Sequence, residues 1–238
     1  MPKHNDAPRL LIVEGATDKK LMHRLCKELG IGDLDVILPI TPEELLTDED
    51  IANGSSGNGK NGAIERLIDL ITNLRDEDNA LQHLAMVVDA DQHQNGHGYQ
   101  RTFDDISQKL RDQGYTQDEE ASTKACGLIF SHSDGLASIG VWIMPNNQED
   151  GALESWISAC INNTELPLFN HATTVVNELS TSFNRTFTGN KKAKAEVATW
   201  LAWQKSPSIG LYAAVGLLDS QSSEYKNLVT WLNYVFPP

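Results

Sequence analysis

Residues 9–18 read RLLIVEGATD, and this stretch decides the fold. Its apolar part, residues 9–13, consists mainly of branched side chains, a pattern typical of a strand buried on both faces of a parallel sheet. Glu14 and Gly15 end the run, and apolar residues then recur with helical spacing over residues 20–29 until Gly30. The sequence therefore predicts a strand followed at once by a helix, with an acid at the junction.

Further segments of the same two kinds alternate along the first half of the chain. We expect strands at 35–40 and 83–88 and helices at 63–74 and 103–113. This β-α alternation predicts an open, mainly parallel sheet with helices on both faces, an α/β fold. Residues 127–131 and 139–144 are also strand-like, and the Ser133-Asp134-Gly135 turn between them favours an antiparallel hairpin or edge.

From Ala152 onward the pattern is helical almost to the end of the chain. The expected helical segments are 152–162, 170–183, 191–204, 209–218 and 223–235. We therefore predict an α/β core over residues 1–163 and a helical extension, packed on that core, over residues 164–238.

The charge is strongly acidic but unevenly spread. The 238 residues carry a formal net charge of −14, which divides into −17 for residues 1–183 and +3 for residues 184–238. A protein that coats nucleic acid only by neutralising phosphates is therefore excluded. The acidic part either repels anions or uses its carboxylates to hold divalent cations. The basic excess around Lys192 and Lys194 fits contact with a phosphate or an ordinary solvated face.

Cysteine usage and hydropathy bear on the compartment. Three widely spaced cysteines make neither a disulfide framework nor a zinc motif. No apolar run approaches the ~18 residues that span a bilayer, and no signal-peptide pattern precedes the first strand. We expect a reduced, cytoplasmic protein without membrane contact.

Carboxylates follow two of the expected strands. Glu14 ends the first strand, Asp18 lies four residues later, and Asp89 and Asp91 follow the third strand. The carboxyl ends of parallel strands meet at one edge of a sheet, where α/β proteins bind ligands. Oxygen-only ligands suit Mg²⁺ or Mn²⁺. The alternative reading is that these acids only cap helices and turns.

The same residues carry a resemblance to a known family. LIVEGATD (11–18) followed by HLAMVVDADQ (83–92) resembles the Toprim domain shared by topoisomerases, bacterial primases and OLD-family nucleases. GVWIMPNNQEDGALESWI (140–157) and KAKAEVATWLAWQ (192–204) are similar to stand-alone bacterial Toprim-like proteins of uncharacterised function. The resemblance covers nearly the whole chain and is nearest in motif to the OLD-like branch.

The resemblance implies roles for individual residues. Glu14, Asp89 and Asp91 match the carboxylates of a first metal ion, and Asp18 and Glu154 match acids that a two-metal branch adds. Lys194, or its neighbour Lys192, matches a basic residue that faces the transition state. Glu14 also matches a general acid or base in the strand-passing enzymes of this family.

Together these features predict a Mg²⁺- or Mn²⁺-dependent enzyme that cleaves phosphodiester bonds, a nuclease of DNA or RNA. One alternative is a non-catalytic Toprim-like module that binds a nucleotide or a protein partner in a defence or repair system. Another is a phosphohydrolase of small nucleotides. The sequence leaves open whether the chain has a protein partner or forms a homo-oligomer.

Two other motifs favour loops. Residues 54–60 (GSSGNGK) resemble a phosphate-binding loop, but Asn61 follows the lysine and no apolar strand precedes the glycines. His93 and His97 follow the third strand, and a polar loop over the site is favoured over transition-metal ligation. Residues 41–61 as a whole are expected to form a loop because of their content of Gly, Asn and Ser.

Overall fold

Strand β1 (Arg9–Val13) and the elements after it are described by a computed structural model that covers residues 9–39, 59–74, 81–93, 98–208 and 210–237. The other strands are β2 (Leu34–Ile37), β3 (His83–Asp89), β4 (Tyr115–Gln117), β5 (Leu128–His132) and β6 (Ile139–Met144). The helices are α1 (Ala16–Glu28), α3 (Lys60–Leu74), α4 (Tyr99–Asp112), α5 (Glu119–Ala125), α6 (Leu153–Ala159), α7 (Leu166–Ser182), α8 (Asn190–Ala202), the 3₁₀ helix η3 (Leu211–Leu217) and α9 (Ser223–Val235).

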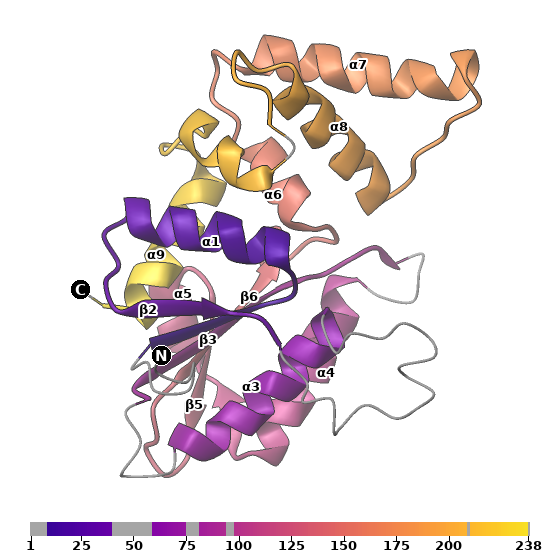
Figure 1. Ribbon diagram of the computed structural model, residues 1–238. Helices are drawn as coiled ribbons and strands as arrows, with labels where there is room; N and C mark the ends of the chain where they lie inside the picture. Colours follow the sequence, from indigo (N-terminus) through magenta and orange to yellow (C-terminus); the bar gives the residue numbers. More distant parts are fainter. Residues whose placement is uncertain (1–8, 40–58, 75–80, 94–97, 209, 238) are drawn as a thin grey trace.

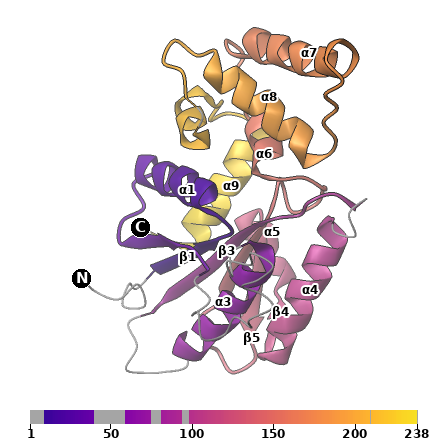
Figure 2. The same ribbon diagram turned by 45° about the vertical axis from the view of Figure 1, so that its right-hand side comes forward.

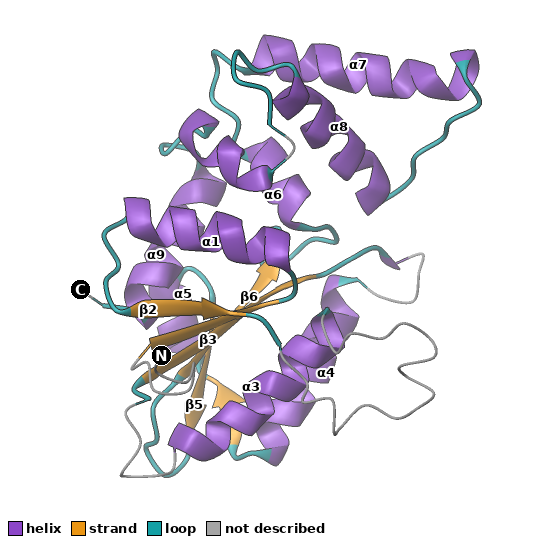
Figure 3. Ribbon diagram, in the orientation of Figure 1, coloured by secondary structure: helices purple, strands orange, loops and turns teal. Residues whose placement is uncertain are grey.

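The described strands form one sheet of six, in the order β2-β1-β3-β6-β5-β4 (Figures 1 and 3). Strands β2, β1, β3 and β6 are parallel, whereas β5 runs antiparallel to both β6 and β4. This confirms the open, mainly parallel α/β sheet flanked by helices, and it confirms the antiparallel hairpin of β5 and β6.

Helices cover both faces of the sheet because side chains alternate along each buried strand. In β1, Leu11 and Val13 pack against α1, α6, α9 and neighbouring helices, whereas Leu10 and Ile12 pack against α3 and α4. Figure 1 shows α1 and α9 on one side of the sheet and α3 and α4 on the other. The apolar run at 9–13 is thus continuous because both of its faces are buried.

Of the C-terminal helices, α7 and α8 lie away from the sheet, and α9 packs against it. Helices α7 and α8 pack on each other and project away from the sheet beyond α6 (Figure 2). Helix α9 then lies against β3 and β6, where the ring of Trp231 is fully buried and its Nε1–H donates to Leu128 O at 3.4 Å. The C-terminal helices predicted from residue 152 onward are therefore present, whereas the domain boundary at residue 163 stays a prediction.

Some elements differ from the sequence-based expectation. Strand β4 and helix α5 were not predicted, because three strand residues and seven helical residues are too short to show a period. The segment expected to be helical at 209–218 is the 3₁₀ helix η3. The 41–61 loop lies largely outside the described residues, and α3 begins at Lys60. None of the helices described is long and apolar enough to cross a membrane.

Candidate metal centre

Two adjacent parallel strands bring Glu14 and Asp89 together. Strand β1 pairs with β3 up to Val13 and Val87, so Glu14, one residue later, and Asp89, two residues later, lie at the same edge of the sheet. Glu14 Oε1 accepts a hydrogen bond from the Asp89 backbone N–H at 2.7 Å. Asp89 Oδ1 in turn accepts one from the Leu153 N–H at 2.9 Å, at the start of helix α6. Both carboxyl groups are thereby held in place by backbone donors.

Two more carboxyl groups come from the first turns of helices. Asp18 lies in the first turn of α1, and Glu154, which is 7% exposed, lies in the first turn of α6. All four acids line one cavity of about 460 Å³. The other lining residues are Gly15, Thr17, Gly59, Lys194, Ala198 and Leu211. The structure thus brings Glu14, Asp18, Asp89, Glu154 and Lys194 to one place.

The electrostatics of this cavity disfavour four bare carboxylates. Burial raises the pKa of Glu14 from 4.5 to about 7, and the charges of Asp91 and Asp18 add to the increase. Burial, followed by the charges of Glu14, Asp18 and Glu154, raises the pKa of Asp89 well above its usual range. The pKa values of Asp18 and Glu154 are also raised, chiefly by burial. The cluster therefore lacks positive charge.

Lys194 is the cation that helix α8 places on this cavity. Its ammonium lowers the pKa of both Asp18 and Glu154, against the larger effect of burial. Lys192 does not line the cavity, and its Nζ lies 3.8 Å from Glu196 Oε1. Of the two lysines that the sequence left open, the geometry favours Lys194.

Asp91 does not line the cavity. Its backbone is left-handed, with φ 63°, and forms an isolated bridge with Gly151. Its Oδ2 lies 2.9 Å from Lys60 Nζ, and its Oδ1 accepts from Asn190 Nδ2 at 2.9 Å. The resemblance implied that Asp89 and Asp91 hold the same metal ion, but after the left-handed turn at Asp91 their carboxyl groups have different partners.

Lys60 is a largely buried charge beside the site that sequence reasoning missed. Besides Asp91, its ammonium donates to Ala90 O and to Thr102 Oγ1, both at 3.1 Å, so all three of its donors are used. Its only signal in the sequence is its place in the glycine-rich GSSGNGK motif. That motif does not show that Lys60 and Asp91, 31 residues apart in the sequence, form an ion pair.

Of the two histidines after β3, the structure describes His93. The backbone N–H of His93 donates to Asp150 Oδ2 at 3.0 Å, while its side chain is exposed. His97 lies outside the described residues, as do residues 54–58 of the glycine-rich motif. Asp150 also accepts from the Tyr99 N–H at 2.8 Å, so this carboxylate links the backbone of His93 to that of Tyr99.

A divalent cation needs several oxygen ligands that converge on one point. The acidic side chains on the cavity offer carboxyl oxygens, the ligands preferred by Mg²⁺ and Mn²⁺. Within the described ranges, however, no three His, Cys, Asp or Glu side chains are already arranged to hold a metal ion. Cation binding therefore requires some of these carboxyl groups to turn towards one another by changing rotamer.

Fold and cavity together define an α/β protein with a carboxylate-lined cavity at the carboxyl edge of a mainly parallel sheet. The chain belongs to the family described as a protein of unknown function (DUF3226), whose model matches residues 8–237. No curated protein and no solved structure matches the chain.

Proposed function

We propose that this protein is a Mg²⁺- or Mn²⁺-dependent enzyme of Toprim type that cleaves phosphodiester bonds in DNA or RNA. The observation that carries the proposal is the convergence of Glu14, Asp18, Asp89 and Glu154 on one cavity together with Lys194. When ionised, these four acids carry more negative charge than Lys194, together with Lys60 near Glu14, can offset, and a divalent cation would neutralise the excess.

The proposed ligands are the four carboxyl groups that line the cavity. Bound there, a divalent cation would supply Lewis-acid stabilisation of the charge that develops on the phosphate. Asp89 is held from α6 and Glu14 from β3, so these two would form the fixed part of the set. Asp18 and Glu154, from α1 and α6, complete it.

Two residues have proposed roles toward the substrate. Glu14 has an alternative role to cation binding: where its carboxyl group is not a ligand, its pKa, raised to about 7, suits it to accept or release a proton near neutral pH. Lys194 lies on the same cavity and places a fixed positive charge where a phosphate oxygen would enter. Both roles depend only on side chains that the structure brings to the cavity.

Thermal unfolding with metal tests the cation site directly. We expect a few millimolar Mg²⁺ or Mn²⁺ to raise the melting temperature of the wild type relative to EDTA, because a ligand of the folded state stabilises it. Asp89→Asn keeps an acceptor for the Leu153 N–H but removes a charge. This variant should fold, lose most of the metal-induced increase and lose cleavage of labelled oligonucleotides.

The matched control is Asp134→Asn, which changes an aspartate whose side chain is 83% exposed. It should respond to metal like the wild type. Equal metal responses in the Asp89 and Asp134 variants would contradict the cation site. Metal binding without turnover of DNA, RNA or small nucleotides would instead support the binding-module alternative, and turnover of small nucleotides alone would support the phosphohydrolase.

A further inference from the structure

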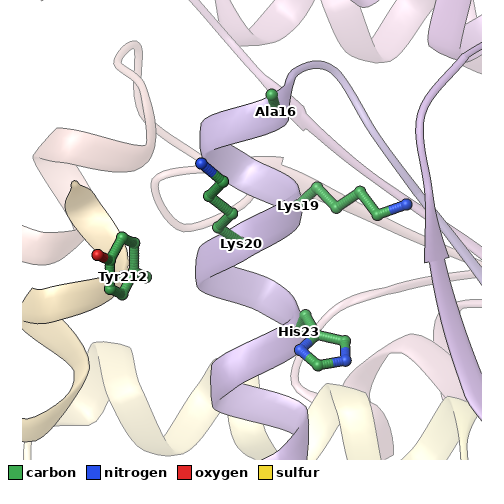
Figure 4. A pocket seen from close by; sticks show the side chains of 5 residues that line it. All are labelled: Ala16, Lys19, Lys20, His23 and Tyr212. Carbon is green, nitrogen blue, oxygen red and sulfur yellow. The ribbon is translucent and has the colours of Figure 1, made fainter.

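A second pocket, of about 560 Å³, lies on the exposed side of helix α1. Ala16, Lys19, Lys20 and His23 line it from α1, and Tyr212 lines it from η3 (Figure 4). Its volume falls within the roughly 300–1,000 Å³ typical of ligand pockets. The charge of its lining is notable in a chain of net charge −14, since two lysines and no acid contribute to it.

The side chains of this pocket are available to a ligand. Neither Lys19 nor Lys20 forms an ion pair with any residue in the part of the chain that the structure describes. Tyr212 is 41% exposed, although most large apolar side chains described are buried. Its ring lies directly over Gly210, where any side chain would collide with it. One part of the ring is thus supported by backbone while another is open to solvent.

The pocket adjoins the candidate metal centre. Asp18 lines the carboxylate cavity, and the next residue of α1, Lys19, lines this pocket. In the same way, Leu211 lines the carboxylate cavity and the next residue of η3, Tyr212, lines this pocket. Neighbouring residues of the same two elements therefore face the two sites, and a ligand long enough can occupy both.

The chemistry of the lining selects the ligand. Ammonium groups attract phosphates, and an exposed phenol ring offers a flat surface on which a base can stack. Figure 4 shows Lys20 on the side of α1 nearer Tyr212, with Lys19 and His23 extending to the other side. Positive charges spread across the helix in this way suit a chain of successive phosphates better than a single one.

We propose that this pocket binds a single-stranded segment of nucleic acid next to the bond that is cleaved. The inference rests on the proposed phosphodiesterase function and adds the substrate class. One base stacks on Tyr212, the phosphate beside it contacts Lys20, and a phosphate further along the strand contacts Lys19 on the other side of the helix. A duplex is excluded from this contact because its bases are already stacked within the helix, so their faces are not open to a protein ring.

Binding and cleavage are measured separately to test this. Fluorescence anisotropy with a labelled single-stranded 12-mer, as DNA and as RNA, is recorded at low salt in EDTA and in Ca²⁺. Tyr212→Ala should weaken binding about five- to tenfold, as expected for the loss of one stacked base. Tyr212→Phe keeps the ring and should bind like the wild type. Lys20→Ala should weaken binding several-fold and reduce its salt dependence.

Two variants on α9 serve as matched controls. Tyr234→Ala removes a tyrosine that is 44% exposed, and Lys226→Ala removes an exposed lysine. Both should bind the 12-mer like the wild type. Three results would contradict the proposed binding of a single strand in this pocket. They are wild-type affinity in the Tyr212→Ala variant, equal affinity for the matched duplex, and no binding by the wild type in either buffer.

Different experimental results would contradict the proposed binding at this pocket and the proposed phosphodiesterase function. If the wild type cleaves with metal but Tyr212→Ala leaves binding and KM unchanged, the pocket assignment is wrong and the enzyme assignment stands. If binding depends on Tyr212 but neither metal-induced stabilisation nor cleavage occurs, the pocket stands as a strand-binding site and the phosphodiesterase proposal is wrong.

Discussion

Glu14 lies at the junction of strand, helix and cavity, and its protonation should make stability depend on pH. Its pKa rises from 4.5 to about 7 on folding, so between these values the folded chain holds more protons than the unfolded chain. The free energy of unfolding should therefore fall as the pH rises through this window, by about 1–3 kcal/mol. Below the window this contribution is complete, and above it the contribution is lost.

Urea unfolding in EDTA across this pH range measures the effect. Because other groups titrate as well, the informative quantity is the difference between the wild type and Glu14→Gln, which keeps the acceptor for the Asp89 N–H. Mg²⁺ requires ionised ligands, so its stabilisation of the wild type should grow over the same window. Parallel profiles for the two proteins would show that Glu14 does not carry the dependence.

Lys60 is predicted to stabilise the turn after β3 rather than to bind substrate. Its side chain is 12% exposed and its three donors are all paired, so Lys60→Met should lower the free energy of unfolding by about 2 kcal/mol. Combined with Asp91→Asn in a double-mutant cycle, it should show a coupling of about 1 kcal/mol. The measurement is the urea-unfolding free energy of the four proteins.

Lys124→Met provides the control for that cycle. Lys124 forms an exposed ion pair with Glu120, and its loss should change stability by less than about 0.5 kcal/mol. A Lys60 effect no larger than the Lys124 effect would refute the prediction.

Asp91 would join the carboxyl groups of the cavity only after its contact with Lys60 breaks.

At the scale of elements, helix α8 is important because it carries Lys194 to the cavity. Glu165, just before α7, accepts from Trp200 Nε1 at 3.0 Å and from Gln204 Nε2 at 2.8 Å, which fixes the end of α8. Glu165→Ala leaves the indole N–H of a fully buried tryptophan without this partner. We expect a loss of about 1–3 kcal/mol and faster amide hydrogen exchange in α8.

The comparison for this prediction is Glu178→Ala, at an exposed position of α7. That variant should keep the wild-type exchange rates. If Glu165→Ala leaves the exchange of α8 unchanged, the contacts with Trp200 and Gln204 do not position the helix, and packing alone must do so.

At the scale of the whole molecule, the acidic charge limits binding of polyanions. With a net charge of −14, the protein can neutralise only the few phosphates that meet Lys19, Lys20 and Lys194. Three contacts give a slope of about −2 for log affinity against log salt with a single strand. Between ~50 and ~200 mM NaCl, affinity for the 12-mer should fall roughly fifteen-fold. Anisotropy titrations at several salt concentrations measure the slope, and a flat dependence would contradict these contacts.

The overall fold could be read from the sequence because its strongest signals are local. The apolar run at 9–13 and the helical periodicity of 63–74 correspond to β1 and α3, since burial on both faces or on one face imposes these patterns directly. Strand β4 and helix α5 escaped prediction because they are short and depend on pairing with β5 and on the Asp118 cap.

The sequence alone determined which carboxylates lie at the sheet edge, because residues that end parallel strands must meet there. That Glu14 and Asp89 are direct neighbours follows from the strand order, in which β1 lies beside β3, and this order was not predicted from the sequence. Only the tertiary structure decided that Asp91 faces Lys60 and that Lys194 rather than Lys192 lines the cavity. The pocket of Tyr212 and α1 also arises only on folding. Side-chain direction in these cases depends on a left-handed turn, a helix rotation and contacts between distant segments, which no local pattern encodes.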